Sequence, residues 1–61
     1  MNRPPPGTMV WWRFRGAPSA FKFGYCTYLD SPSLVRMGAY NGDSHHGPVV
    51  DCNEIEWRPY R

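Results

Sequence analysis

The sequence predicts a small all-β protein, and three observations lead to that prediction. Aromatic residues make up 16% of the 61-residue chain, and they fall almost entirely in short segments of alternating polarity. Aromatic and β-branched side chains suit the half-buried surface of a pleated strand. Turn residues separate the segments, and no stretch shows the apolar period of a helix. Five short strands joined by tight turns are therefore expected.

The chain begins with a proline-rich segment, residues 1–7, whose three consecutive prolines favour polyproline II and cannot donate to a strand ladder. We expect a disordered, flexible tail here, followed by one domain over residues 8–61. A chain of this length buries only about 60% of its unfolded surface, so the domain should be marginally stable. Formation of a homo-oligomer is one way for such a domain to gain stability.

The first strand is expected over Thr8–Phe14, with Val10, Trp12 and Phe14 on the core face because side chains alternate along a strand. Residues 16–19, Gly-Ala-Pro-Ser, should end it.

The second strand is expected over Phe21–Leu29. Its core face should carry Phe21, Phe23, Tyr25, Thr27 and Leu29. Gly24 in the middle of this strand predicts a bulge, a bend or a close backbone approach.

Three further strands are expected over residues 34–40, 49–52 and 55–57. Asp30-Ser31-Pro32-Ser33 marks the first intervening turn, because Asp and Ser bond to nearby backbone and Pro presets φ. Asn41-Gly42 marks the next, since this pair suits the positive φ of hairpin turns. A corner at Asn53 and Glu54 should precede the last strand.

This pattern of strand lengths and turns resembles the SH3-like barrels, a group that includes the Tudor-like domains. The resemblance covers residues 8–60, and it implies a single small five-stranded SH3-like barrel. In such barrels, rings from neighbouring strands and loops form a groove for proline-rich peptide or a cage for a methylated cation.

A barrel this small cannot bury all of its rings, and exposed rings are common contact groups of small binding proteins. The rings expected to face outward are those whose strand phase is opposite to that of the expected core face, or which lie at the margin of that face. Arginine joins aromatic residues at the centres of protein interfaces. The candidate partner-binding residues are Trp11, Arg13, Tyr28, Tyr40, Trp57 and Arg58. The alternative is that these rings only complete the core or plug the barrel ends.

Arginine also alternates with aromatic residues in segments 11–15 and 57–61. Rings that stack on bases beside arginines that hold phosphates are typical of single-strand nucleic-acid binding. The net charge is only +2, however, far from the strong basic field of a dedicated nucleic-acid binder. A protein partner is therefore favoured, and single-stranded nucleic acid is the alternative.

Catalysis is not indicated by the residue types and their spacing. Cys26, His45, His46 and Cys52 are zinc ligands by type, but their spacing matches no common zinc arrangement. No nucleophile is placed beside the histidines by the sequence. We expect no metal, no cofactor and no catalytic residue.

Tyr25-Cys26-Thr27 with Leu29, followed by His45, Gly47 and Val49, resembles plasmid-encoded type II dihydrofolate reductase. That family is a short SH3-like barrel that works as a tetramer around one pore. Its pore strand carries a Val-Gln-Ile-Tyr motif that binds folate and NADPH, whereas this chain has Val49-Val50-Asp51-Cys52. No catalytic residue is carried over, and a reductase-like homo-oligomer is the third hypothesis.

No signal peptide and no long apolar run are recognised, so a cytoplasmic location without membrane contact is expected, with Cys26 and Cys52 as thiols. The leading prediction is a non-enzymatic interaction module that binds a protein partner. Its small size and simple architecture are typical of phage- or plasmid-type accessory proteins.

Overall fold

The computed structural model describes residues 3–60, and these residues form an all-β structure. Its strands are β1 (Thr8–Phe14), β2 (Lys22–Tyr28), β3 (Leu34–Gly38), β4 (Val49–Asp51) and β5 (Ile55–Pro59). They form one antiparallel sheet in the order β4-β3-β2-β1-β5. Within residues 3–60 there is no helix of the length and apolar character needed to cross a membrane.

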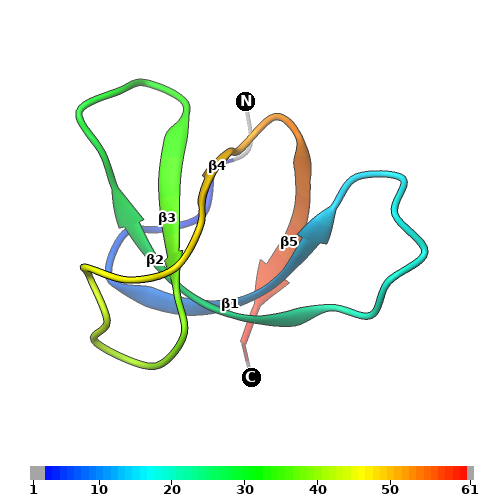
Figure 1. Cartoon of the computed structure of the whole chain (residues 1–61), viewed down its shortest axis with the longest axis horizontal. Coiled ribbons are helices and arrows are strands. Elements are labelled where there is room, and N and C mark those ends of the chain that lie inside the picture. The colour runs from blue at the N-terminus through cyan, green and yellow to red at the C-terminus, as the bar shows by residue number, and fades with distance from the viewer. Residues whose placement is uncertain (1–2, 61) are drawn as a thin grey trace.

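The sheet curls, so that the edge strands β4 and β5 rise on the same side of the crossing strands β1 and β2 (Figure 1). A tight corner joins the two edges, and in it the Glu54 N–H donates to the Asp51 carbonyl at 2.9 Å. The described residues show no ladder between β4 and β5, so the sheet is open along this line. The predicted all-β class and five strands are confirmed, while the closed barrel is not shown.

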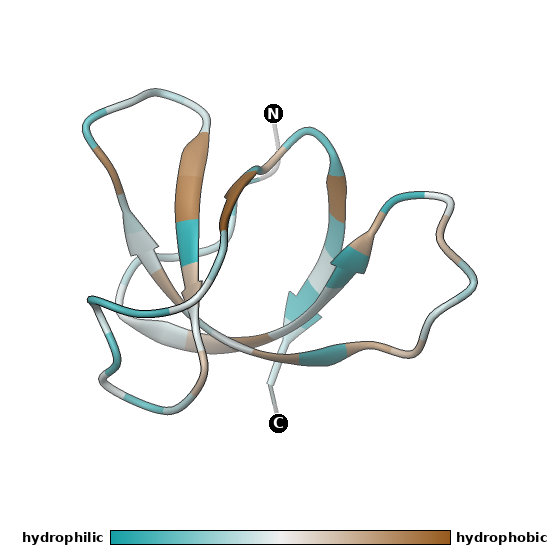
Figure 2. Ribbon diagram, in the orientation of Figure 1, coloured by the Kyte–Doolittle hydropathy of each residue, from teal (hydrophilic) through white to brown (hydrophobic). Residues whose placement is uncertain are grey.

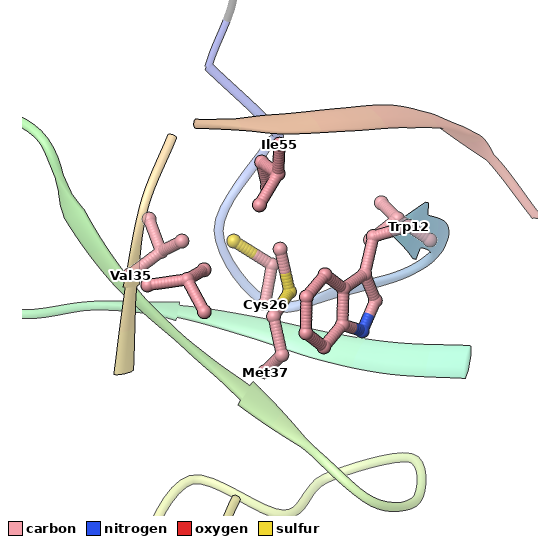
Figure 3. Packing of buried hydrophobic residues seen from close by; sticks show 7 residues of the cluster. Trp12, Cys26, Val35, Met37 and Ile55 are labelled. Carbon is pink, nitrogen blue, oxygen red and sulfur yellow. The ribbon is translucent and has the colours of Figure 1, made fainter. Parts of the chain in front are cut away.

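The core lies inside this curl. It contains Val10, Trp12, Cys26, Val35, Met37, Val50 and Ile55. Figure 3 shows Ile55 pointing from β5 toward Cys26 and Met37 on the opposite wall. Apolar residues colour parts of β3, β4 and the start of β5 brown in Figure 2, which matches their contribution to this core. Apolar burial from both walls therefore holds the curl together.

The predicted core face of β2 is wrong. Gly24 and Cys26 face the core, and Phe23 is exposed. The reason is the volume of the Trp12 ring: a Cβ on Gly24 would lie 2.7 Å from Trp12 Cδ1 and 2.9 Å from Met37 Sδ. The predicted close backbone approach at Gly24 is confirmed. Because Trp12 already fills this space, the rings of Phe23 and Tyr25 lie on the other face of β2.

The predicted flexible tail is not confirmed for residues 3–7, while Met1 and Asn2 lie outside the described residues. Pro4 is fully buried, and its carbonyl accepts a hydrogen bond from the Tyr28 hydroxyl at 2.8 Å. The Arg3 guanidinium lies 3.5 Å from the centroid of the Tyr28 ring. Gly7 N–H donates to the Cys26 carbonyl at 2.7 Å. Prolines cannot extend a ladder as donors, but here Pro4 covers apolar surface beside β2.

The Asn41-Gly42 turn is present, with Gly42 at φ +87° and the Asp43 N–H donating to the Tyr40 carbonyl at 3.1 Å. It does not form a two-residue hairpin, because β3 ends at Gly38 and β4 begins only at Val49. The strand predicted to reach Tyr40 is therefore shorter than expected.

Asp43 organises the loop between β3 and β4. Its buried carboxylate accepts hydrogen bonds from the N–H groups of Ala39, His45 and His46 at 3.0, 3.3 and 3.0 Å. The Nδ1 atom of His46 lies 3.1 Å from the same carboxylate. Burial alone would raise the pKa of Asp43, but these hydrogen bonds lower it to about 2. The loop is thus built around an ionised carboxylate.

Candidate functional site

Three aromatic rings meet on the outer face of β5, β1 and β2. Trp11 stacks on Phe23 with ring centroids 4.0 Å apart and an interplanar angle of 24°. Tyr60, directly after β5, lies 5.6 Å from the Trp11 centroid and 5.0 Å from the Phe23 centroid. We call Trp11, Phe23 and Tyr60 the outer cluster.

Strand alternation and register explain how the outer cluster forms. Val10 and Trp12 point into the core, so Trp11 between them must point outward. Phe23 is the cross-strand partner of Trp11 in the pairing of β1 with β2, which brings their side chains together.

Two arginines border the outer cluster. The guanidinium carbons of Arg13 and Arg58 lie 4.3 and 4.7 Å from the centroid of the Phe21 ring. Arg13 Nε also pairs with the Glu56 carboxylate at 3.2 Å. Arg58 makes no ion pair with any acidic residue within residues 3–60. Since stacking occupies only the face of a guanidinium, the N–H donors at its edge stay available to a ligand.

An apolar pocket of about 250 Å³ adjoins the outer cluster, where β1 begins and β5 ends. Its walls are Pro5, Thr8, Met9, Val10, Trp57, Pro59 and Tyr60. Tyr60 therefore belongs both to the pocket and to the outer cluster. The Thr8 hydroxyl donates to the Pro5 carbonyl at 2.7 Å, which ties the N-terminal segment to the pocket wall.

The six sequence-predicted residues do not form a single surface. Trp11, Arg13 and Arg58 come together on the outer face. Tyr28 lies against Arg3 and Pro4, and Tyr40 stands in the loop between β3 and β4 with 60% of its surface exposed.

Trp57 differs from the expectation, because it is half-buried and packs against the core. Residues two apart on a strand share a face, so Trp57 follows Ile55 toward the inside of the curl.

Sequence reasoning missed Phe21, Phe23 and Tyr60 as members of the outer surface. The sequence pattern places Phe21 and Phe23 on the core face, and it indicates Tyr60 only as part of the arginine–aromatic segment 57–61. One signal was available for Tyr60, which lies two residues after Arg58 and so shares its face by strand alternation. Nothing local identified Phe23, since both faces of β2 carry apolar residues.

The chemistry of the described residues favours binding. Residues 3–60 contain no group of three or more potential metal-ligating side chains. Cys26 and Cys52 are buried and are not bridged to each other. Burial raises the pKa of Cys26 to about 11, so this thiol is protonated and weakly nucleophilic at neutral pH.

Comparison with protein-family models, with curated proteins and with solved structures found no match to this chain. The role of the outer cluster is therefore judged from its own geometry.

Proposed function

We propose that this protein is a non-enzymatic interaction module that binds a protein partner through the outer face of β5, β1 and β2. The observation that carries the proposal is the outer cluster, in which Phe23 is 44% and Tyr60 is 49% exposed although both rings are large and apolar. Contiguous exposed apolar surface of this kind marks protein interaction sites.

The composition and rigidity of the face support this function. Trp, Tyr, Phe and Arg are the residue types enriched in protein interfaces. Mutual stacking of Trp11 and Phe23 already holds both rings in place, as does the contact of each with Tyr60. Binding then immobilises few additional side chains, and the entropic cost of association is reduced.

The charges on the outer face favour protein over single-stranded nucleic acid. Affinity for nucleic acid depends on several cations that neutralise phosphates. On this face Arg13 is paired with Glu56, whose carboxylate would also repel a phosphate. Arg58 has no ion pair within residues 3–60, but a single such arginine beside a paired one is a weak phosphate-binding surface.

Our proposal includes an SH3-like barrel architecture and a cytoplasmic location. The strand order, with edge strands β4 and β5 joined by a corner, supports the first. The two buried cysteines that are not bridged to each other support the second, because thiols are typical of reducing compartments.

The test is a pull-down with tagged protein from a lysate of its native cells, at low and high salt and with and without nuclease. Phe23→Ala removes an exposed ring of the outer cluster. Val49→Ala is the matched control, because Val49 is 45% exposed and lies on β4, away from the cluster. Circular dichroism should first show that both variants are folded.

We expect wild type and Val49→Ala to capture the same protein, and Phe23→Ala to lose it. Capture should survive nuclease and high salt, since a largely apolar interface is weakly screened. Loss of the captured material after nuclease treatment would assign the face to nucleic acid. Equal capture by Phe23→Ala would show that the interface lies elsewhere.

A further inference from the structure

The pocket beside the outer cluster suits one large apolar side chain. Met9, Val10 and Pro59 provide apolar wall, and the Thr8 hydroxyl is already engaged with Pro5. A volume of about 250 Å³ falls below the range of roughly 300–1,000 Å³ that is usual for small-molecule and cofactor sites. The pocket therefore matches a side chain of a macromolecular partner better than a free ligand.

Arg58 offers an exposed positive charge that a partner can complement. It is exposed and stacked on Phe21, and it has no acidic partner within residues 3–60. The other arginine of the face, Arg13, is already compensated by Glu56. A guanidinium without an acidic neighbour suits one carboxylate of a partner, which it can bind through two parallel hydrogen bonds.

Strand geometry sets the distance between these two recognition points. Arg58 and Tyr60 are two residues apart on the same face, a spacing of roughly 7 Å along an extended chain. The Arg58 guanidinium leans over Phe21, the ring that the Arg13 guanidinium also contacts, and Arg13 pairs with Glu56 at the end of the face away from Tyr60. That lean increases the separation from the pocket to roughly 13 Å, or four residues of extended chain.

From these three features we propose that the partner binds as an extended segment carrying a large apolar residue and an Asp or Glu two to four residues apart. The apolar side chain enters the pocket beside Tyr60, and the carboxylate pairs with Arg58. This inference rests on the proposed function and adds the chemical identity of the bound segment. It requires no further group from the protein.

The experiment selects a displayed library of random short peptides on the immobilised full chain, and compares wild type with Arg58→Glu, Met9→Gln and Val49→Ala. Arg58→Glu reverses one exposed charge, and Met9→Gln makes one pocket wall polar. Val49→Ala again serves as the matched control on β4.

We expect wild type and Val49→Ala to enrich peptides that contain the apolar and acidic pair at the stated spacing. Arg58→Glu should select Lys or Arg in place of the acid. Met9→Gln should weaken the preference for the apolar residue and keep the acid. In a synthetic peptide with the selected sequence, changing its Glu to Gln should lower affinity about tenfold, as expected for a charge-assisted hydrogen bond.

Three results would overturn the inference: no enrichment of any peptide, the same consensus on Arg58→Glu as on wild type, or self-association of purified protein that Phe23→Ala abolishes. The last would assign the face to a second copy of this chain. The pull-down with Phe23→Ala reports separately on the proposed function, because a folded partner surface could bind the outer cluster without such a segment.

Discussion

Replacing Gly24 by alanine tests the packing that decides which face of β2 is inside. The added Cβ would stand 2.7 Å from Trp12 Cδ1, 2.8 Å from Trp12 Nε1 and 2.9 Å from Met37 Sδ. Trp12 and Met37 are each only 2% exposed, and the Trp12 Nε1–H donates to the Phe23 carbonyl at 3.3 Å. Neither neighbour can move without disturbing the core.

The free energy of unfolding should fall because two opposing effects differ in size. Overpacking a well-filled core costs about 1–3 kcal/mol. Alanine restricts the unfolded chain, which returns about 0.4–1 kcal/mol when the native φ suits it, as the φ of Gly24 does. The net loss lies between about 0 and 2.6 kcal/mol, or a fall in Tm of up to roughly 20 °C for a domain of this size.

The assay is thermal and urea unfolding followed by circular dichroism, in wild type and in a Trp12→Phe background. Phenylalanine keeps a ring edge near the new Cβ but lacks the fused six-membered ring of tryptophan, so the smaller ring has room to shift away and the cost of Gly24→Ala should be smaller in that background. A coupling of at least about 0.5 kcal/mol is expected between residues in direct contact. If Gly24→Ala stabilises the protein, or costs the same in both backgrounds, the Trp12 ring does not pack on Gly24.

Three further predictions concern Asp43, Cys26 and Arg3. The hydrogen bonds to Asp43 lower its pKa from 3.8 to about 2. The contribution of this carboxylate to the free energy of unfolding is therefore present above pH 3.8 and is lost as the pH falls from 3.8 toward 2. Asp43→Asn should flatten that part of a Tm–pH profile, and an unchanged profile would contradict the prediction. Burial raises the pKa of Cys26 from 9.0 to about 11, so the thiolate fraction of Cys26 at pH 8 should be about a hundredfold lower in the folded protein than in the unfolded chain. Labelling with a disulfide reagent, mapped by mass spectrometry, measures this difference. Fast labelling of Cys26 in the folded protein would refute the prediction. Arg3→Ala should cost at least about 0.5–1 kcal/mol in urea unfolding, because it removes the cation–π contact with Tyr28 and the hydrogen bond that Arg3 donates to the Ser31 carbonyl at 3.0 Å. No change would show that these contacts do not hold the N-terminal segment.

Local chemistry was enough to place the strands and the turns. The strand predicted at Thr8–Phe14 has the same bounds in the structure, and Gly16 and Gly42 adopt the positive φ that interrupts or turns the chain. These features depend on residues close together in the sequence, whose side-chain alternation and φ preferences can be assessed without the rest of the fold.

The site was predictable only where one strand carried a clear alternation. Trp11 and Arg13 were expected to point outward because Val10 and Trp12 were expected inside, and the structure agrees. Phe23 could not be placed in this way, since β2 has apolar residues at both phases. Tyr60 joins the outer cluster only through the pairing of β5 with β1.

The sequence by itself therefore determined the all-β class, the approximate strand bounds and the outward direction of Trp11 and Arg13. Tertiary structure alone decided the phase of β2, the burial of Pro4 and the assembly of the outer cluster. The physical reason is that these features depend on the space that the Trp12 ring fills beside Gly24 and on the register between neighbouring strands. Both are contacts between residues distant in the chain, which no local preference encodes.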